Sequence, residues 1–270
     1  MMDLFGPRPR TSPTHAMLLA AGFGRRMRPL TEQTAKPLLV VAGQPLIDHA
    51  LDRLDAAGVE AVVVNAHYRS ADLDRHLLAR SARRTGRPRT TLLHEPELLD
   101  TGGGVLAAMT AGLLGDAASF FVVNGDSFWL DGPRPALARL AEAFNPARHD
   151  VMLLVSRIPW AVGEVGAGDF AIDADGLVRR RDENEIVPYV YSGVQIVSPN
   201  LFRRAPIAGI GTGSPRAGRF GMNLLWDQAI GAGRLRAVVH DGPWFHLSRP
   251  SDIVATERAL RDPNFGPPNT

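Results

Sequence analysis

The chain has 270 residues, 45% of them hydrophobic, and it contains no cysteine. A chain of this length and composition can bury a sizeable core, and the lack of cysteine excludes both a disulfide framework and a thiolate metal site. The formal net charge is only +2 and the arginines are scattered along the chain, which argues against nucleic acid as a partner.

Both ends of the chain are predicted to be poorly ordered. Residues 1–15 contain Pro7, Pro9 and Pro13 and lack the apolar run that a signal peptide or a membrane anchor needs, so we interpret them as a disordered leader. Residues 263–270 hold further prolines and should fray. These features predict a cytoplasmic protein without a membrane partner.

Residues 16–145 alternate short apolar runs with helical patterns. Apolar residues recur at helical spacing over 46–54, around 73–78 and over 105–114. Strands are predicted at Met17–Ala21, Ala61–Asn65, Thr90–His94 and Phe120–Asn124. This alternation is typical of βαβ units, and it predicts an α/β fold with a Rossmann-like, mostly parallel sheet flanked by helices.

Residues 146–262 continue with strand-like runs between glycine-rich and charged turns. Strands over 151–155, 170–172 and 189–197 predict a smaller, mixed β extension of the same domain. A helix over 224–230, a strand over 235–239 and a closing helix over 253–260 should follow. The segment Ala208–Arg219 is rich in glycine, proline and arginine, and we expect a mobile loop there, whose role the sequence leaves open.

The strongest local signal lies in Leu18–Leu30, where an apolar strand runs into a Gly-x-Gly turn followed by arginines. Gly22 and Gly24 lack the Cβ that would block a close approach to backbone N–H groups, and Arg26 can bridge phosphate oxygens. A dinucleotide-binding fingerprint needs a third glycine where this chain has Met27. The turn therefore predicts a phosphate-binding site, with a plain strand-ending turn as the alternative.

Lys36 is the only lysine among 30 basic residues, and Pro37 follows it. Because proline disfavours helix for the residue before it, we expect Lys36 in an extended loop near the phosphate-binding turn. A compact ammonium there could neutralise charge on a reacting phosphate, since phosphoryl-type transfer depends mainly on positioning and charge stabilisation. A merely solvated lysine is the alternative.

Asp126 ends the apolar strand Phe120–Asn124. Ligands of open α/β sheets bind beyond the carboxyl ends of the strands, and Mg²⁺ usually takes few carboxylates and several phosphate or water oxygens. This position predicts a magnesium ligand, with a turn or helix-cap aspartate as the alternative.

A glycine-rich loop lies between Glu95 and Gly104. Glu95 could accept a hydrogen bond from a base N–H, and the backbone at Gly102 could meet the edge of the base. The alternative is that the glycines form an ordinary helix entry.

Small residues flank strands in the second half of the chain, at Gly166–Phe170 and Tyr191–Gly193. They would suit a sugar packed against backbone, although simple hairpin turns explain them equally well. The segment Trp244–His246 could bring a side chain to the metal, or belong to the core. The remaining histidines show no metal-ligand spacing.

Together these segments resemble the sugar-1-phosphate nucleotidyltransferase family from Ala16 to about Leu260. The resemblance rests on the turn Gly22–Met27, on Lys36-Pro37 and on Asp126, in that order and at similar spacing. Four further segments are most similar to its N-acetylmuramate-1-phosphate uridylyltransferase branch: Val41–Ile47, Glu95–Gly104, Gly168–Phe170 and Tyr191–Gly193.

The resemblance implies a nucleotide-diphospho-sugar transferase fold, with a nucleotide-binding half at 16–145 and a sugar-phosphate-binding half at 146–262 of one domain. It implies UTP, a sugar-1-phosphate and Mg²⁺ as partners. Catalytic roles would fall to Arg26, Lys36 and Asp126. The nucleotide would be bound by Ala21, Gly22, Gly24, Arg26, Glu95, Thr101, Gly102 and Asn124, the sugar by Asp169, Gly193 and Trp244, and the metal by Asp126 and His246.

One position departs from the family pattern. A late aspartate should complete the metal site, and His246 stands there, with Ser248-Arg249 in place of the usual Gly-Thr. A neutral imidazole brings no negative charge and suits Mn²⁺ better than Mg²⁺. His246 and the segment Ala208–Arg219 therefore leave open a catalytically weak regulatory subunit that binds sugar nucleotides. A mannose-1-phosphate guanylyltransferase or related enzyme also stays open, because loops decide the choice of base and sugar.

Overall fold

The structure is a computed structural model, and it describes residues 12–83, 86–163, 165–174, 176–204, 218–262 and Phe265, with the side chain of residue 127 left out. The predicted loop Ala208–Arg219 lies outside the described residues except for its last two positions, and so does most of the predicted leader and tail. No described helix has the length and apolar character of a membrane span.

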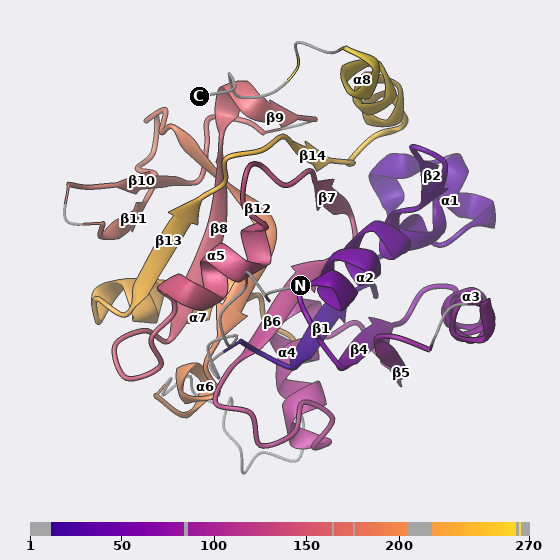
Figure 1. The fold of residues 1–270 in the computed structure, drawn as a ribbon, viewed down its shortest axis with the longest axis horizontal. Coiled ribbons are helices and arrows are strands. Elements are labelled where there is room, and N and C mark those ends of the chain that lie inside the picture. The colour runs from indigo at the N-terminus through magenta and orange to yellow at the C-terminus, as the bar shows by residue number, and fades with distance from the viewer. Residues whose placement is uncertain are drawn as a thin grey trace, which may run out of the picture.

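A nine-stranded sheet forms the centre of the described part of the chain (Figure 1). Its main path runs β11-β10-β12-β6-β1-β4-β5, and β8 pairs with β12 and β13 beside this path. The strands are β1 (His15–Leu19), β4 (Ala61–Ala66), β5 (Arg89–His94), β6 (Phe120–Asn124), β8 (Val151–Arg157), β10 (Phe170–Ile172), β11 (Val178–Arg180), β12 (Tyr189–Val197) and β13 (Leu235–Val239).

The first half of the chain supplies the parallel part of the sheet. Strand β1 pairs in parallel with β4 on one side and with β6 on the other, and β4 pairs in parallel with β5. The chain order therefore reverses between β1 and β6, which is the point where open α/β sheets bind ligands. Strand β12 then pairs antiparallel with both β6 and β8, so the second half extends the sheet as a mixed one, as predicted.

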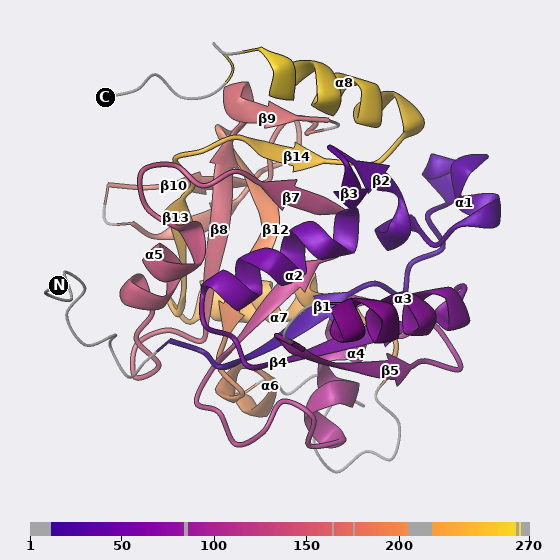
Figure 2. The same ribbon diagram turned by 45° about the vertical axis from the view of Figure 1, so that its right-hand side comes forward.

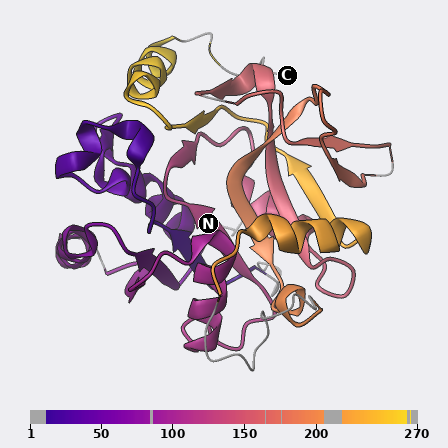
Figure 3. The same cartoon turned by 180° about the vertical axis from the view of Figure 1, so that it is seen from behind.

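Helices cover both faces of this sheet, which explains why its central strands are apolar runs instead of alternating ones. On one face lie α2 (Leu46–Ala56), α3 (Ser70–Arg83) and α5 (Ala136–Ala143), which share an apolar cluster with Leu18 and Val123. On the other lie α4 (Asp100–Thr110), α6 (Asn200–Arg204) and α7 (Met222–Gly231), which pack with Met17 and Val122. Figures 2 and 3 show these two layers from different sides.

A second, smaller sheet brings the end of the chain back to the centre. It consists of β7 (Ser127–Trp129), β14 (Trp244–His246) and β9 (Ala161–Val162), in the order β7-β14-β9. The helix α8 (Pro250–Arg261) lies beyond it at the top of Figure 2. Met27, Phe128 and Phe245 belong to a separate apolar cluster. Phe265 packs its ring 5.9 Å from that of Phe245.

The remaining elements are short. They are the 3-10 turns η1 (Arg25–Met27), η2 (Lys36–Leu38) and η3 (Ile158–Trp160), the helix α1 (Leu30–Gln33) and the hairpin β2 (Val40–Val41) and β3 (Gln44–Pro45). One expectation was wrong here, because Lys36 opens a 3-10 turn instead of lying in an extended loop. Proline is tolerated in a first helical turn, where its missing N–H has no partner to lose, and the extended residues Thr34 and Ala35 lie before the turn.

Two predicted boundaries differ in the structure. Strand β1 ends at Leu19 instead of Ala21, because the backbone N–H of Ala20 binds the Asn65 side chain. The glycine-rich loop expected before the third helix is part of that helix, since α4 already begins at Asp100. Asp100 takes a left-handed backbone conformation (φ 63°), which turns the chain directly into the helix.

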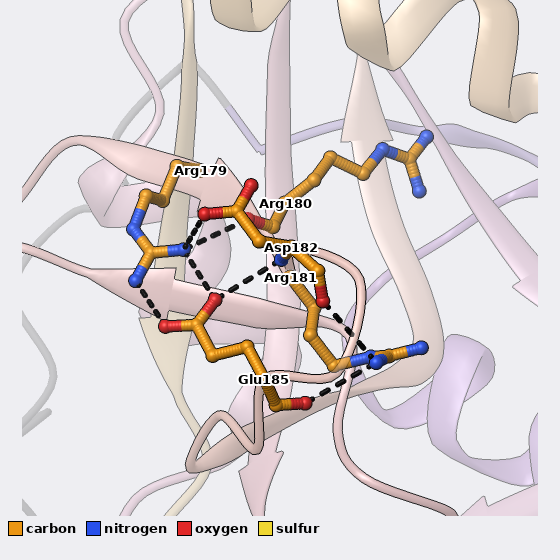
Figure 4. A network of polar contacts seen from close by, with 5 residues as sticks. All are labelled: Arg179, Arg180, Arg181, Asp182 and Glu185. Carbon is orange, nitrogen blue, oxygen red and sulfur yellow. Dashed lines mark hydrogen bonds and ion pairs between the residues drawn. The ribbon is translucent and has the colours of Figure 1, made fainter.

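A network of polar contacts lies at strand β11 of the hairpin β10–β11 and in the loop that follows it (Figure 4). The guanidinium of Arg179 donates to both carboxylate oxygens of Glu185, and Arg181 donates to the backbone oxygens of Asp182 and Glu185. The Arg180 guanidinium lies 5.5 Å from the ring centres of both Phe170 and Trp226. The Arg180 contacts attach the hairpin to the helical layer at α7, and the contacts of Arg179 and Arg181 order the loop that follows β11.

Candidate active site

A pocket of about 410 Å³ opens beyond the carboxyl ends of β1 and β6. It lies where the strand order reverses, as expected for a ligand site in a sheet of this type. The structure brings most of the predicted nucleotide-site and catalytic residues to its wall: Ala21, Gly22, Gly24, Arg26, Lys36, Glu95, Thr101, Asn124 and Asp126.

Gly24 fixes the shape of the glycine-rich turn. Its backbone is left-handed (φ 60°), and its carbonyl accepts hydrogen bonds from Met27 N (2.9 Å) and Thr31 Oγ1 (2.9 Å). A Cβ at this position would lie 2.9 Å from Thr31 Cγ2 and 3.0 Å from Lys36 Cβ. Only glycine therefore lets the stem of Lys36 pass close to the turn.

Lys36 and Asp126 form an ion pair, with 3.0 Å between Nζ and Oδ2. Burial alone would raise the pKa of Asp126, but the ammonium of Lys36 holds that pKa below its usual value. The second oxygen, Oδ1, is buried and has no hydrogen-bond partner among the described residues. An ionised carboxylate with one unused oxygen, facing a pocket, suits a hard divalent cation.

His246 lies beside Asp126 but outside the pocket wall. Strand β14 pairs with β7 so that His246 is opposite Ser127, and Leu247 N donates to the carbonyl of Asp126 (3.1 Å). His246 is not among the described residues that line the pocket. Its imidazole stacks on Trp244, with 5.6 Å between ring centres. The predicted role of His246 as a metal ligand therefore stays a prediction.

Glu95 supports the glycine-rich turn through a buried chain of hydrogen bonds. Its side chain accepts from Asn65 Nδ2 (2.7 Å) and from Leu99 N (3.1 Å), and Asn65 Oδ1 in turn accepts from Ala20 N (2.8 Å). A Cβ on Gly104 would lie 2.8 Å from both Asn65 and Glu95. Glu95 also lines the pocket, so its predicted contact with a base stays a prediction beside this structural role.

Gly102 is not in the pocket wall, in contrast to the expectation of a flat loop against a base. Its N–H and that of Gly103 both donate to the carbonyl of Phe220 (2.9 and 3.0 Å). A Cβ on Gly102 would collide with the Phe220 ring. The glycines thus admit the segment 218–222 against the start of α4, where Thr101 Oγ1 accepts from Met222 N (2.9 Å).

The three predicted sugar-binding residues lie away from the pocket wall as far as the structure describes it. Asp169 Oδ2 accepts from Tyr191 N (2.8 Å), so the carboxylate joins β10 to β12. Gly193 has a positive φ (76°) at an irregularity in β12. Trp244 is 3% exposed and belongs to an apolar cluster. Their contacts with a sugar stay predictions, and the indole N–H of Trp244 has no partner among the described residues.

Sequence reasoning missed several residues of the pocket wall. Asn65 ends a predicted strand next to that of the glycine-rich turn, and this position was a usable signal. Asp100 lies between the predicted residues Glu95 and Thr101, and Ser248 follows His246 by two residues, so their positions were signals as well. Arg219 carries no local signal, because the end of the predicted loop brings it to the pocket.

The doubly wound sheet, with a glycine-rich turn, a lysine and an aspartate gathered at its switch point, defines an α/β protein with a pocket at the position where such sheets bind ligands. The family model described as nucleotidyl transferase matches residues 15–161. The chain belongs to the sugar-1-phosphate nucleotidyltransferase family.

The chain is 40% identical over 252 residues to N-acetylmuramate alpha-1-phosphate uridylyltransferase from Caulobacter vibrioides, covering 93% of this chain and 98% of that protein. It is 36% identical over 190 residues to the protein of the same name from Neisseria meningitidis, covering 69% and 76% of the two chains. A UDP-glucose pyrophosphorylase solved with UDP-glucose has a TM-score of 0.70 at 16% identity, covering 91% of this chain and 97% of that one, which confirms the fold.

Proposed function

We propose that this protein joins UTP to N-acetylmuramate α-1-phosphate to give UDP-N-acetylmuramate and pyrophosphate. The observation that carries the proposal is the single pocket that gathers Gly22, Gly24, Arg26, Lys36 and Asp126. The near full-length similarity to uridylyltransferases supports the choice of substrates.

The reaction is an in-line displacement at phosphorus. An oxygen of the sugar phosphate attacks the α-phosphorus of UTP, the bond from that phosphorus to the α,β-bridging oxygen breaks, and pyrophosphate leaves with the electron pair. Lys36 supplies positive charge beside the reacting phosphates, and Arg26 with the glycine-rich turn positions the triphosphate. The ion pair with Asp126 holds the Lys36 ammonium in the pocket before substrates bind.

A divalent cation fits the site, since Asp126 offers an ionised carboxylate with an unused oxygen. Mg²⁺ would neutralise phosphate charge there, and Asp126 is the residue that would hold it, with Mn²⁺ as an alternative ion. In this proposal His246 is the second protein ligand of the ion. The alternative is that His246 does not contact the ion.

His246→Asp tests that second role. A ligand role predicts tighter Mg²⁺ binding and less preference for Mn²⁺ in the variant, because a carboxylate adds charge and a hard oxygen. Calorimetric titration of each ion, in the presence of UTP, measures this. An unchanged affinity and ion preference would exclude a metal role for His246.

Pyrophosphate release by the purified protein tests the function. UTP, GTP, ATP, CTP and dTTP are each combined with N-acetylmuramate-, N-acetylglucosamine-, glucose- and mannose-1-phosphate, with Mg²⁺ or Mn²⁺. Turnover is expected with UTP and N-acetylmuramate-1-phosphate. Turnover with GTP and mannose-1-phosphate would favour a guanylyltransferase, and no turnover with any pair would favour a regulatory subunit.

The proposed product is a cell-wall precursor, so the proposed reaction belongs to peptidoglycan recycling. Because UTP is a cytoplasmic metabolite, the reaction would take place in the cytoplasm. The partners in this proposal are small molecules only, with neither nucleic acid nor a membrane involved.

A further inference from the structure

Ser248 is a buried serine in the pocket wall whose hydroxyl is unused. The residue is 1% exposed and lines the same pocket as Lys36 and Asp126. Its Oγ has no hydrogen-bond partner among the described residues. A buried hydroxyl without a partner is unfavourable, so a ligand that supplies a partner would be bound more tightly here.

The backbone holds Ser248 firmly in place. Its N–H donates to Asp252 Oδ2 (2.8 Å), and the next N–H, of Arg249, donates to the same oxygen (2.7 Å). On the other side, the N–H of Leu247 donates to the carbonyl of Asp126 (3.1 Å). The start of α8 and the end of β6 thus fix the Ser248 backbone next to the residue that faces the reacting phosphates.

The surroundings of Ser248 select the kind of ligand. Asp126 Oδ1 in the same pocket is also without a partner, so these two groups do not satisfy each other in the described structure. The pocket end around Lys36 and Asp126 is the one that receives phosphate in the proposed reaction, and a hydroxyl donates well to an anionic phosphate oxygen. Ser248 comes from the segment after β14 and lines the pocket together with Gly22 and Gly24 of the glycine-rich turn.

We propose that the Ser248 hydroxyl donates a hydrogen bond to the phosphate of the sugar-1-phosphate and so positions the attacking oxygen. This inference rests on the proposed function. It assigns to the second substrate a contact that neither Arg26 nor the glycine-rich turn provides.

Ser248→Ala tests the proposal in the full-length protein. The KM for the sugar-1-phosphate should rise about tenfold or more, as for the loss of a hydrogen bond to a charged group, while the KM for UTP stays unchanged. Without ligand, the midpoint of thermal unfolding should stay the same or rise, because the variant removes an unsatisfied buried hydroxyl.

Ser198→Ala is the matched control. Ser198 is also 1% exposed, but its Oγ accepts from Asn200 N (3.2 Å) at the start of α6 and it is not in the pocket wall described. Its replacement should lower the unfolding midpoint and leave both KM values unchanged. Ser248→Gly, which also lacks the hydroxyl, should reproduce the selective rise in the KM of Ser248→Ala.

Three results would overturn the proposal: a lowered midpoint with unchanged KM values, an equal rise in both KM values, or no change at all. Calorimetric binding of N-acetylmuramate-1-phosphate separates this inference from the proposed function. If the wild type binds the sugar phosphate without turnover, the function fails, and weaker binding by Ser248→Ala still supports the contact. If the wild type does not bind it, both fail.

Discussion

Lys36, the only lysine of the chain, lies beside both Asp126 and the glycine-rich turn. Lys36 contacts Asp126 through its ammonium, and its Cβ lies 3.0 Å from where a Cβ on Gly24 would lie, closer than an ordinary van der Waals contact. A compact ammonium on a flexible stem fits this space, whereas a planar guanidinium is broader and holds its charge in a fork. We therefore expect arginine to be a poor replacement for Lys36.

Lys36→Ala and Lys36→Arg should both reduce kcat/KM for pyrophosphate release. We expect a loss of about 10²- to 10³-fold for the alanine variant, since it removes a charge aimed at the reacting phosphates. The arginine variant should recover only part of this loss. Full activity in Lys36→Arg would show that positive charge alone matters and that the shape of the ammonium does not.

Gly24→Ala and Gly22→Ala form a second pair of residue-scale tests. Gly24 has a positive φ and a crowded Cβ position, whereas a Cβ on Gly22 meets nothing within 4 Å. Gly24→Ala should therefore lower the free energy of unfolding by about 1–3 kcal/mol, measured in urea. Gly22→Ala should leave stability unchanged and weaken UTP binding, because its Cβ would point at the ligand instead of at the protein. Equal stability losses would contradict this division.

At the scale of elements, the site depends on how strand ends and helix starts are tied together. Two hydrogen bonds of the Asn65 side chain, one with Ala20 and one with Glu95, join the ends of β1, β4 and β5 across the sheet. The segment 218–222 closes the start of α4 through the carbonyl of Phe220. These contacts fix the pocket wall before any ligand is bound.

Asn65→Ala should lower the free energy of unfolding by about 2–3 kcal/mol, because it leaves the Ala20 N–H and one Glu95 oxygen buried without partners. The KM for UTP should rise as well, since the glycine-rich turn begins at Ala20. Asn223→Ala, on an exposed position of α7, is the control and should change neither quantity. A stability loss with unchanged KM would limit Asn65 to a purely structural role.

At the scale of the whole molecule, buried histidines and exposed carboxylates set the response to acid. Burial lowers the pKa of His240 below 6.5, so the unfolded chain binds its proton first as the pH falls. Arg179 lowers the pKa of Glu185 from 4.5 to about 2, so the contribution of that carboxylate is present above about pH 4.5 and is lost as the pH falls towards 2.

The free energy of unfolding should therefore decline as the pH drops below about 6.5, and decline further below about 4.5. Below about pH 6.5, His240→Leu should reduce the slope of the free energy of unfolding against pH by at most the contribution of one proton. Glu185→Gln should reduce this slope below about pH 4.5. Urea unfolding across a pH series measures both slopes. A His240→Leu profile parallel to that of the wild type between pH 5 and 6.5 would show that His240 does not titrate differently on folding.

The sequence alone determined most strands of the central sheet and the helices α2, α3, α4, α7 and α8, because the spacing of apolar residues follows from which faces are buried. It did not predict the helices α5 and α6 or the small sheet β7-β14-β9. It also placed Gly24, Arg26, Lys36 and Asp126 at one edge, since a parallel sheet collects the ends of its strands there. Tertiary structure decided the rest. It turned the predicted loop at Gly102 into a helix start beneath Phe220, and it brought Ser248 from the far end of the chain to the pocket. Contacts between remote segments have no local period, so only the folded chain reveals them.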